Sequence, residues 1–177
     1  MIIKFLNNLN EINYNIINDN IIFKNKNLKN SNFDINGSIN FKPFYSDLII
    51  NLKKIDLQDL ENLLYTVHQK KETDFKNLSG VLKINFDNID NKNFKNGTLD
   101  LSFEDSKIKI ENLKFDIYDF AILEVVEYEY FTNINQILQM KIKINIIDKD
   151  KFNRFLFNYK KDVIDEDIIY FTFQYNL

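Results

Sequence analysis

Hydrophobic and polar residues alternate along most of the chain, which is the pattern of β-strands with one buried and one solvated face. Residues 31–41 show this alternation without a break. Shorter patterns over 12–16 and 21–23 predict two strands before residue 30. Further strands are expected at 45–55, 80–89, 97–104, 107–118, 119–131, the start of 136–159, and 167–175. The sequence therefore predicts a mainly β protein with about nine strands in one twisted, mainly antiparallel sheet.

One unit occurs twice, at 45–69 and at 136–159, with equivalent positions 92 residues apart (Asp56 and Asp148). Each copy is an alternating strand, an Ile-Asp pair, and a short amphipathic helix whose apolar residues fall at i, i+3, i+4 and i+7. Both aspartates are predicted helix N-caps, because a carboxylate there accepts hydrogen bonds from backbone N–H groups of the first turn. The apolar positions of the two copies are Leu48, Ile50, Leu52, Leu60, Leu63, Leu64 and Val67, then Met140, Ile142, Ile144, Phe152, Phe155, Leu156 and Tyr159.

Two of the expected strands change the parity of their alternation partway along. In 107–118 the change falls near Glu111 and Asn112, and in 119–131 it falls at Val125 and Val126. A β-bulge adds one residue to a strand, so it would keep both halves of each apolar set on the same face. The sequence predicts a bulge at each place.

The two helices are too small to cover the sheet that the strands predict. About nine strands span roughly 40 Å, whereas a helix of about 12 residues is roughly 18 Å long and 10 Å wide. The remaining apolar face must curl on itself, meet another subunit, or hold something hydrophobic. We therefore expect a single domain over 1–177, built as an open β-groove or half-barrel.

The floor of such a groove is predicted from the inward residues of the central meander, between the two helical units. None of these residues carries a polar group that could fix a lipid head group, so binding would be unselective among acyl chains. The alternative is that they are core beneath the helices or a folded-over segment. The predicted floor consists of Leu82, Ile84, Phe86, Leu99, Leu101, Phe103, Ile108, Ile110, Leu113, Phe115 and Ile117.

Net charge and residue composition argue against several classes of partner and binding site. The net charge of −3 argues against nucleic acid, which normally requires a concentrated basic patch. There are no cysteines for disulfides or Cys-type zinc sites. No apolar run is long enough for a signal peptide or a membrane-spanning helix, so we expect either a soluble chain or a fragment without its targeting segment. Abundant Asn, Ile and Lys, with a single Arg and a single Ala, suggest an AT-rich genome.

Candidate catalytic residues are few. His68 is the only histidine, and its position late in the first helix favours a capping role. Glu127 and Glu129 alternate with tyrosines, as on an ordinary solvated strand face. The run Asp162, Asp165, Glu166 and Asp167 lacks the spacing and glycine of a calcium loop. With three glycines, the chain has no phosphate loop or nucleophile elbow. We therefore expect no enzyme activity, cofactor or metal.

Several phrases resemble the AsmA-like family of repeating β-groove envelope proteins, of the YhdP and TamB type. The resemblance rests on "INGSINFKPF", "LIINLKKIDLQDLENLLYTV", "FKNLSGVLKINFDNID" and "FKNGTLDLSFEDSKIKIENLKFDI", followed by the second strand–Asp–helix unit. It covers about two-thirds of the chain, from residue 35 to 160. The motifs are mostly apolar patterning with a few Gly and Asp residues.

The resemblance implies a long curved groove that is anchored in the inner membrane, crosses the periplasm and moves phospholipid toward the outer membrane. This chain is shorter than such proteins and lacks their membrane helix, so it would be one segment or fragment, with membrane contacts made by missing segments. Two alternatives stay open. One is a structural module that self-associates through edge strands. The other is a closed, lipocalin-like barrel for a small hydrophobic ligand.

Overall fold

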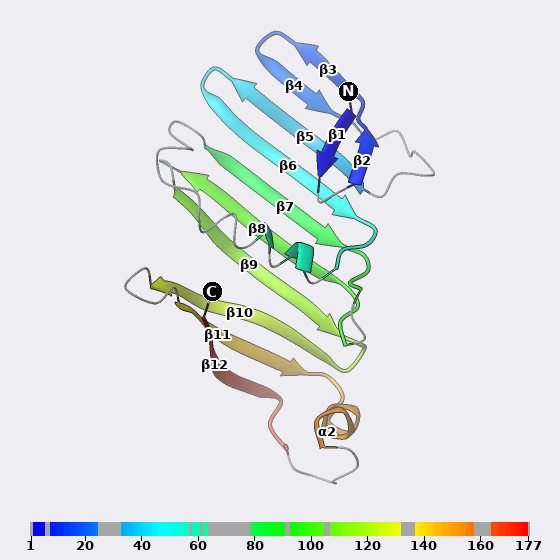
Figure 1. Ribbon diagram of the computed structural model, residues 1–177, viewed down its shortest axis with the longest axis vertical. Coiled ribbons are helices and arrows are strands. Elements are labelled where there is room, and N and C mark those ends of the chain that lie inside the picture. Colours follow the sequence, from blue (N-terminus) through cyan, green and yellow to red (C-terminus); the bar gives the residue numbers. More distant parts are fainter. Residues whose placement is uncertain are drawn as a thin grey trace. The chain divides into compact units, whose positions relative to one another are not determined.

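The computed structural model describes residues 2–5, 8–24, 33–56, 58–60, 62–63, 79–90, 93–104, 107–131, 137–157 and 164–176, and these are mainly β (Figure 1). β1 (Ile2–Phe5) and β2 (Asn8–Glu11) pair in a two-stranded antiparallel sheet. All other strands belong to one ten-stranded sheet. They are β3 (Tyr14–Ile17), β4 (Asn20–Phe23), β5 (Phe33–Phe41), β6 (Phe44–Leu52), β7 (Gly80–Phe86), β8 (Gly97–Glu104), β9 (Lys107–Ile117), β10 (Ala121–Phe131), β11 (Ile137–Ile146) and β12 (Ile168–Asn176).

The large sheet is open. Its strand order follows the chain without interruption, from β3 at one end to β12 at the other. The prediction of a mainly β fold with one open sheet is confirmed. A closed barrel would require hydrogen bonds between the first and last strands of the sheet. Because the described strands form a linear order with two ends, the closed-barrel alternative is wrong.

One pair of neighbouring strands is not antiparallel. β6 and β7 pair in parallel, with Leu48 opposite Leu82 and Leu52 opposite Phe86. The segment between them returns the chain to the starting end of β6, as a parallel pair requires, and residues 58–60 and 62–63 within it are helical. In the second copy of the repeat, α2 (Lys149–Phe157) lies between β11 and β12, which pair antiparallel. The two copies therefore share the strand–Asp–helix pattern, but the strands on either side of the helix pair in parallel in the first copy and antiparallel in the second.

Both aspartates of the repeat make the hydrogen bonds of a helix N-cap. The Asp56 carboxylate accepts a hydrogen bond from Asp59 N at 2.6 Å, and the Asp148 carboxylate accepts one from Lys151 N at 3.0 Å. Their backbone carbonyls accept the first helical hydrogen bonds, from Leu60 N and Phe152 N. The switch from strand to helix thus occurs at the same residue type in both copies, as the sequence predicts.

By its internal contacts the chain forms two compact units. Unit 1 comprises Met1–Asn91 and Asn96–Glu111, and unit 2 comprises Lys92–Lys95 and Asn112–Leu177. The boundary falls within β9, so this division leaves the single-domain prediction as a prediction. Each unit has a core of its own.

The core of unit 1 lies where β6 and β7 end. Leu52 and Phe86 are buried side by side, and Leu60 of the helical segment is buried as well. Ile55 and Ile89 continue the parallel pairing beyond the strands, with Ile55 N donating to Asn88 O at 3.0 Å. This corner is therefore held both by apolar burial and by backbone hydrogen bonds.

The core of unit 2 lies beneath α2. Phe152 is the buried residue of the helix that belongs to this core, and its ring contacts that of Phe120 with centroids 6.3 Å apart. Phe155 and Leu156, which the helical spacing also places on the apolar side, are exposed. The buried cluster consists of Ile117, Phe120, Ala121, Ile142, Ile144, Ile146 and Phe152.

The structure agrees with one expected irregularity of the strands and differs from the sequence prediction in their number. The register of β10 and β11 shifts between Val125 and Glu127, which confirms the bulge predicted there. The bulge expected near Glu111 and Asn112 stays a prediction. The strands β1 and β2 were not expected, because each has four residues and neither shows a sustained alternation.

Candidate functional site: the apolar faces of the sheet

In unit 1, alternate residues of β3 to β8 share one face of the sheet and line up across neighbouring strands. We call this set the unit 1 apolar face. Among the described residues it carries no charge, and only Ser46 and the glycines interrupt its hydrophobic side chains. It consists of Tyr14, Ile16, Ile21, Phe23, Phe33, Ile35, Gly37, Ile39, Phe41, Phe44, Ser46, Leu48, Ile50, Leu52, Gly80, Leu82, Ile84, Phe86, Gly97, Leu99, Leu101 and Phe103.

The opposite face of unit 1 carries its polar and charged side chains. Asn85 Nδ2 donates to Asn51 Oδ1 at 2.6 Å, and Asn51 Nδ2 donates to Asp34 Oδ1 at 2.7 Å. These bonds cross β7, β6 and β5 as a ladder of side chains. Lys83 and Asp100 form an ion pair on the same face, with Nζ and Oδ1 3.9 Å apart. Hydrophobic residues such as Ile49 and Val81 also lie on this face, so it is mixed, whereas the apolar face carries no charge among the described residues.

Burial on the unit 1 apolar face falls from one end of the strands to the other. Leu52 and Phe86, next to the helical corner, are each 1% exposed. Leu48 and Leu82, four residues back along the same two strands, are only partly buried. Ile16 on β3 reaches 65% exposure. The corner is thus closed core, whereas the far end of the face presents hydrophobic side chains to solvent.

Unit 2 repeats this gradient on an apolar face of its own. Next to α2, Ile117, Ala121 and Ile146 lie opposite one another and are buried. Farther from the helix, Phe171 and Phe173 of β12 are 41% and 45% exposed. Phe171 lies opposite the buried Ile142, so this row passes from core to open surface within two strands.

Ion pairs link neighbouring strands on the opposite face of unit 2. Glu124 lies between Lys114 and Lys143, with carboxylate to Nζ distances of 3.3 and 3.6 Å. Asn145 Nδ2 also donates to Glu124 at 3.2 Å. Burial raises the pKa of Glu124, but hydrogen bonds from Lys114 and Asn145 and the charges of both lysines outweigh it, so the pKa is lowered. The carboxylate therefore stays ionised and bridges three strands.

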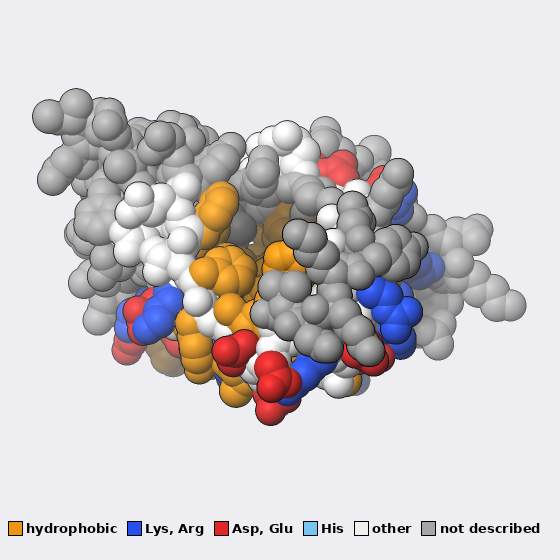
Figure 2. Space-filling view, turned by 90° about the horizontal axis from the view of Figure 1, so that it is seen from below, with side chains coloured by type: hydrophobic (Ala, Val, Ile, Leu, Met, Phe, Trp, Pro, Cys, Tyr) orange, Lys and Arg blue, Asp and Glu red, His pale blue; other side chains and the backbone are white. Residues whose placement is uncertain are grey.

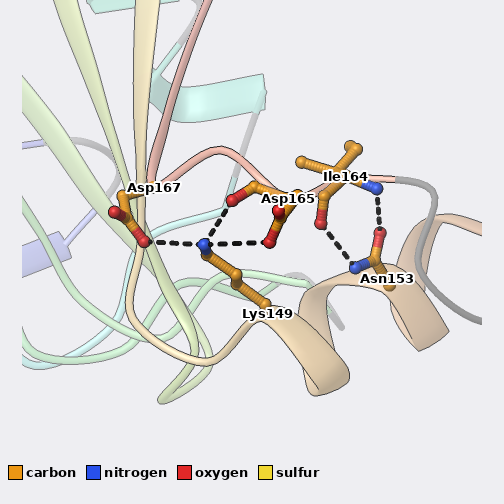
Figure 3. Close-up of polar contacts among 5 residues, drawn as sticks. All are labelled: Lys149, Asn153, Ile164, Asp165 and Asp167. Atoms are coloured by element: carbon orange, nitrogen blue, oxygen red, sulfur yellow. Dashed lines mark hydrogen bonds and ion pairs between the residues drawn. The ribbon is translucent and has the colours of Figure 1, made fainter.

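Polar contacts at α2 fix the start of β12 (Figure 3). The Lys149 ammonium lies 3.0 Å from the Asp167 carboxylate and 3.4 Å from that of Asp165, and also donates to Asp165 O. Hydrogen bonding to Asp167 raises the pKa of Lys149. Asn153 binds the backbone of Ile164. These contacts tie the segment before β12 to the helix.

Seen from below, from the side where α2 lies in Figure 1, the visible hydrophobic side chains gather near the middle of the view (Figure 2). Acidic and basic side chains lie around them. The large exposed hydrophobic residues of unit 2 include Ile147, Phe155, Leu156, Phe171 and Phe173.

The predicted groove floor divides into two classes in the structure. Seven of the eleven residues are core, among them Leu101, which lies opposite Leu82, and Ile117, which belongs to the cluster under α2. Leu82, Phe103, Ile108 and Ile110 are partly buried and lie on accessible parts of the strands. The core class consists of Ile84, Phe86, Leu99, Leu101, Leu113, Phe115 and Ile117.

The groove floor predicted from the sequence omits neighbouring residues that extend the two apolar faces. Leu48 and Ile39 on unit 1, and Phe171 and Phe173 on unit 2, share the apolar faces and are partly or largely exposed. Their alternation is as regular as that of the central meander. The alternation of β5, β6 and β12 is the signal that could have added them, because pairing in register carries a face from strand to strand.

The other candidate residues show no catalytic grouping. His68 and Asp162 lie outside the described residues. Glu127 is exposed and paired with Lys141, with Oε1 and Nζ 3.2 Å apart. Among the described residues, no group of three or more His, Asp or Glu side chains is placed to hold a metal ion. In the same part of the chain, no helix has the length and hydrophobicity needed to cross a membrane.

Comparison of the chain with protein-family models, with curated proteins and with solved structures finds no match. The resemblance to the AsmA-like family therefore stays a prediction from the quoted phrases.

Proposed function

We propose that the unit 1 apolar face binds acyl chains, as a lipid-holding segment of an AsmA-like β-groove protein of the bacterial periplasm. One observation carries this proposal. The partly buried side chains of Ile21, Ile39, Leu48, Leu82 and Phe103 cross five neighbouring strands without an intervening charge. An extended apolar strip of this kind suits a long hydrocarbon chain better than a compact ligand.

The chemistry of the strip limits what it can recognise. Among the described residues, the polar groups of the unit 1 apolar face are the hydroxyls of Ser46 and Tyr14, and neutral hydroxyls cannot neutralise a phosphate. Affinity would come from burial of methylene groups, at about 0.8 kcal/mol each. The proposed function is therefore non-enzymatic and indifferent to head group, with chain length as the main determinant of affinity.

Leu82 offers the sharpest test, because it is accessible and is not part of the closed core. Leu82→Asp places a charge in the middle of the strip, whereas Val81→Asp places the same charge on the opposite face at a residue that is 42% exposed. Native mass spectrometry of protein purified without detergent would detect retained phospholipid. We expect the native chain and Val81→Asp to carry lipid and Leu82→Asp to carry at least tenfold less.

Two further measurements make the result decisive. Circular dichroism must show the same β content in both variants, and Leu82→Phe, which keeps the site apolar, must retain lipid. Titration with fatty acids of increasing chain length should show tighter binding as the chain grows. Equal lipid retention by Leu82→Asp and Val81→Asp, or an affinity independent of chain length, would overturn the proposal.

A further inference from the structure

The edge formed by β12 lacks the features that protect most sheet edges. β12 is the last strand of the order, so one side of its backbone has no neighbouring strand among the described residues (Figure 1). Its nine residues, Ile168–Asn176, include no charged side chain and no proline. Natural sheets usually blunt a free edge with lysine, proline or a very short strand. Within the described part of the chain, therefore, nothing in the sequence of β12 opposes pairing with another strand.

The sequence of β12 is nearly self-complementary around Thr172. If two copies pair antiparallel with Thr172 opposite Thr172, then Phe171 of each copy faces Phe173 of the other, and Tyr170 faces Gln174. Opposed aromatic residues and opposed threonines are favourable cross-strand pairs. No like charges meet, because β12 carries none. The same register buries phenylalanines that are 41% and 45% exposed in the single chain.

From this we infer that the chain forms a two-fold symmetric dimer in which the β12 strands of two copies pair antiparallel, centred on Thr172. A two-fold axis perpendicular to the sheet keeps equivalent faces on the same side. The apolar faces of the two copies of unit 2 therefore continue across the new interface. The inference is independent of lipid binding, since it rests on the free edge and on the register.

β3, at the other end of the strand order, is the weaker candidate. β3 has only four residues, Tyr14–Ile17, and so offers fewer backbone hydrogen bonds than β12. Pairing of β3 with β12 of another copy would also be heterologous and would build open-ended assemblies in place of a closed dimer. The geometry thus favours β12 with β12.

Crosslinking tests the register directly, because the chain contains no cysteine. In the proposed register, two copies of Thr172→Cys face each other with Cα atoms about 4.5–5.5 Å apart, which a disulfide can bridge. Gln174→Cys lies on the same face, but its two copies would be about 13 Å apart along the strands. Under mild oxidation we expect a covalent dimer from Thr172→Cys and none from Gln174→Cys. Equal crosslinking of both variants, or of neither, would overturn the proposal.

A charge at the axis provides an independent test. Thr172→Glu places a carboxylate opposite Lys141 within each copy, so the fold should tolerate it, whereas in the dimer the two carboxylates face each other. In sedimentation equilibrium we expect the native chain and Thr172→Val to form dimers, and Thr172→Glu to dissociate at concentrations at least tenfold higher. A native chain that is monomeric, or one that grows beyond a dimer, would contradict the proposed pairing.

Discussion

Asn153 on α2 binds both backbone groups of Ile164. Its Nδ2 donates to Ile164 O at 3.0 Å, and Ile164 N donates to its Oδ1 at 3.1 Å. The asparagine is 5% exposed, and it is the one buried polar or charged residue among the described side chains. Its amide thus acts as a substitute peptide group, pairing with the segment that leads into β12 as a neighbouring strand would.

Replacing Asn153 should therefore be costly. Asn153→Ala leaves the N–H and C=O groups of Ile164 without their partners, and we expect it to lower the free energy of unfolding by about 2 kcal/mol. Asn153→Asp keeps the acceptor but turns a carboxylate oxygen toward Ile164 O, so it should cost at least as much. Urea denaturation measures both. Arg154→Ala, at the exposed next position, should change stability by less than about 0.5 kcal/mol. A similarly small effect of Asn153→Ala would contradict the role assigned to the two hydrogen bonds between Asn153 and Ile164.

The helix caps give a second prediction. Asp148→Ala should destabilise the protein by about 1 kcal/mol, because Lys151 N loses its hydrogen bond to the carboxylate. Asp148→Asn keeps an acceptor oxygen and should recover most of that loss, although it removes the exposed ion pair with Lys151. Asp56→Ala should behave in the same way through Asp59 N. Equal losses for the Ala and Asn variants would show that charge, and not capping, matters at these sites.

Much of the secondary structure is readable from the sequence, because local physics determines it. Strict alternation places 97–104 as a strand, and the structure has β8 over the same residues. The direction of β7 could not be read in this way, since alternation is the same in parallel and antiparallel strands. Only the return of the chain between β6 and β7 determines that Leu52 lies beside Phe86.

The sequence shows which residues of the candidate site are apolar, but it does not show which of them are buried and which are accessible. Phe86 and Leu82 follow the same alternation, yet one is core and the other is partly exposed, because the helical corner covers only one end of the strands. Asn153 and Phe155 show the same difficulty on α2. Helical spacing assigns burial to the phenylalanine, whereas the structure buries the asparagine because the backbone of Ile164 needs a partner.

Gly80 supplies a third prediction. Its φ is +149°, and a Cβ there would overlap the backbone oxygen of Ser46, the residue opposite it in the parallel pair. Gly80→Ala should therefore cost more than about 2 kcal/mol, from both backbone strain and the clash. Adding Ser46→Ala removes only the side-chain part of the clash, so the double variant should stay destabilised. Full recovery of the unfolding midpoint in that double variant would contradict this account.

The Glu124 carboxylate, which bridges three strands of unit 2, makes the free energy of unfolding depend on pH. The pKa of Glu124 is lowered in the folded state, as is that of Asp119, which accepts a hydrogen bond from Lys151. A group with a lowered folded pKa stabilises the fold above its unfolded pKa, and this contribution is lost as the pH falls through the folded value. The pKa values of Lys149 and Lys151 are raised, so their contribution is present below the unfolded pKa and is lost as the pH rises through the folded value.

Glu124→Gln isolates the acid side of this profile. At pH 7 it should lower the free energy of unfolding by about 0.5–1 kcal/mol, because Lys114 and Lys143 then lie near each other without the carboxylate between them. As the pH falls below the ordinary glutamate pKa and then through the lowered folded value, the native Glu124 becomes protonated and the difference between the two proteins should shrink. Urea denaturation at pH 3 to 8 measures both curves, with Glu127→Gln as the control for removing an exposed carboxylate from the same strand. A difference that stays constant over this range would mean that the Glu124 side chain contributes by packing, independently of its charge.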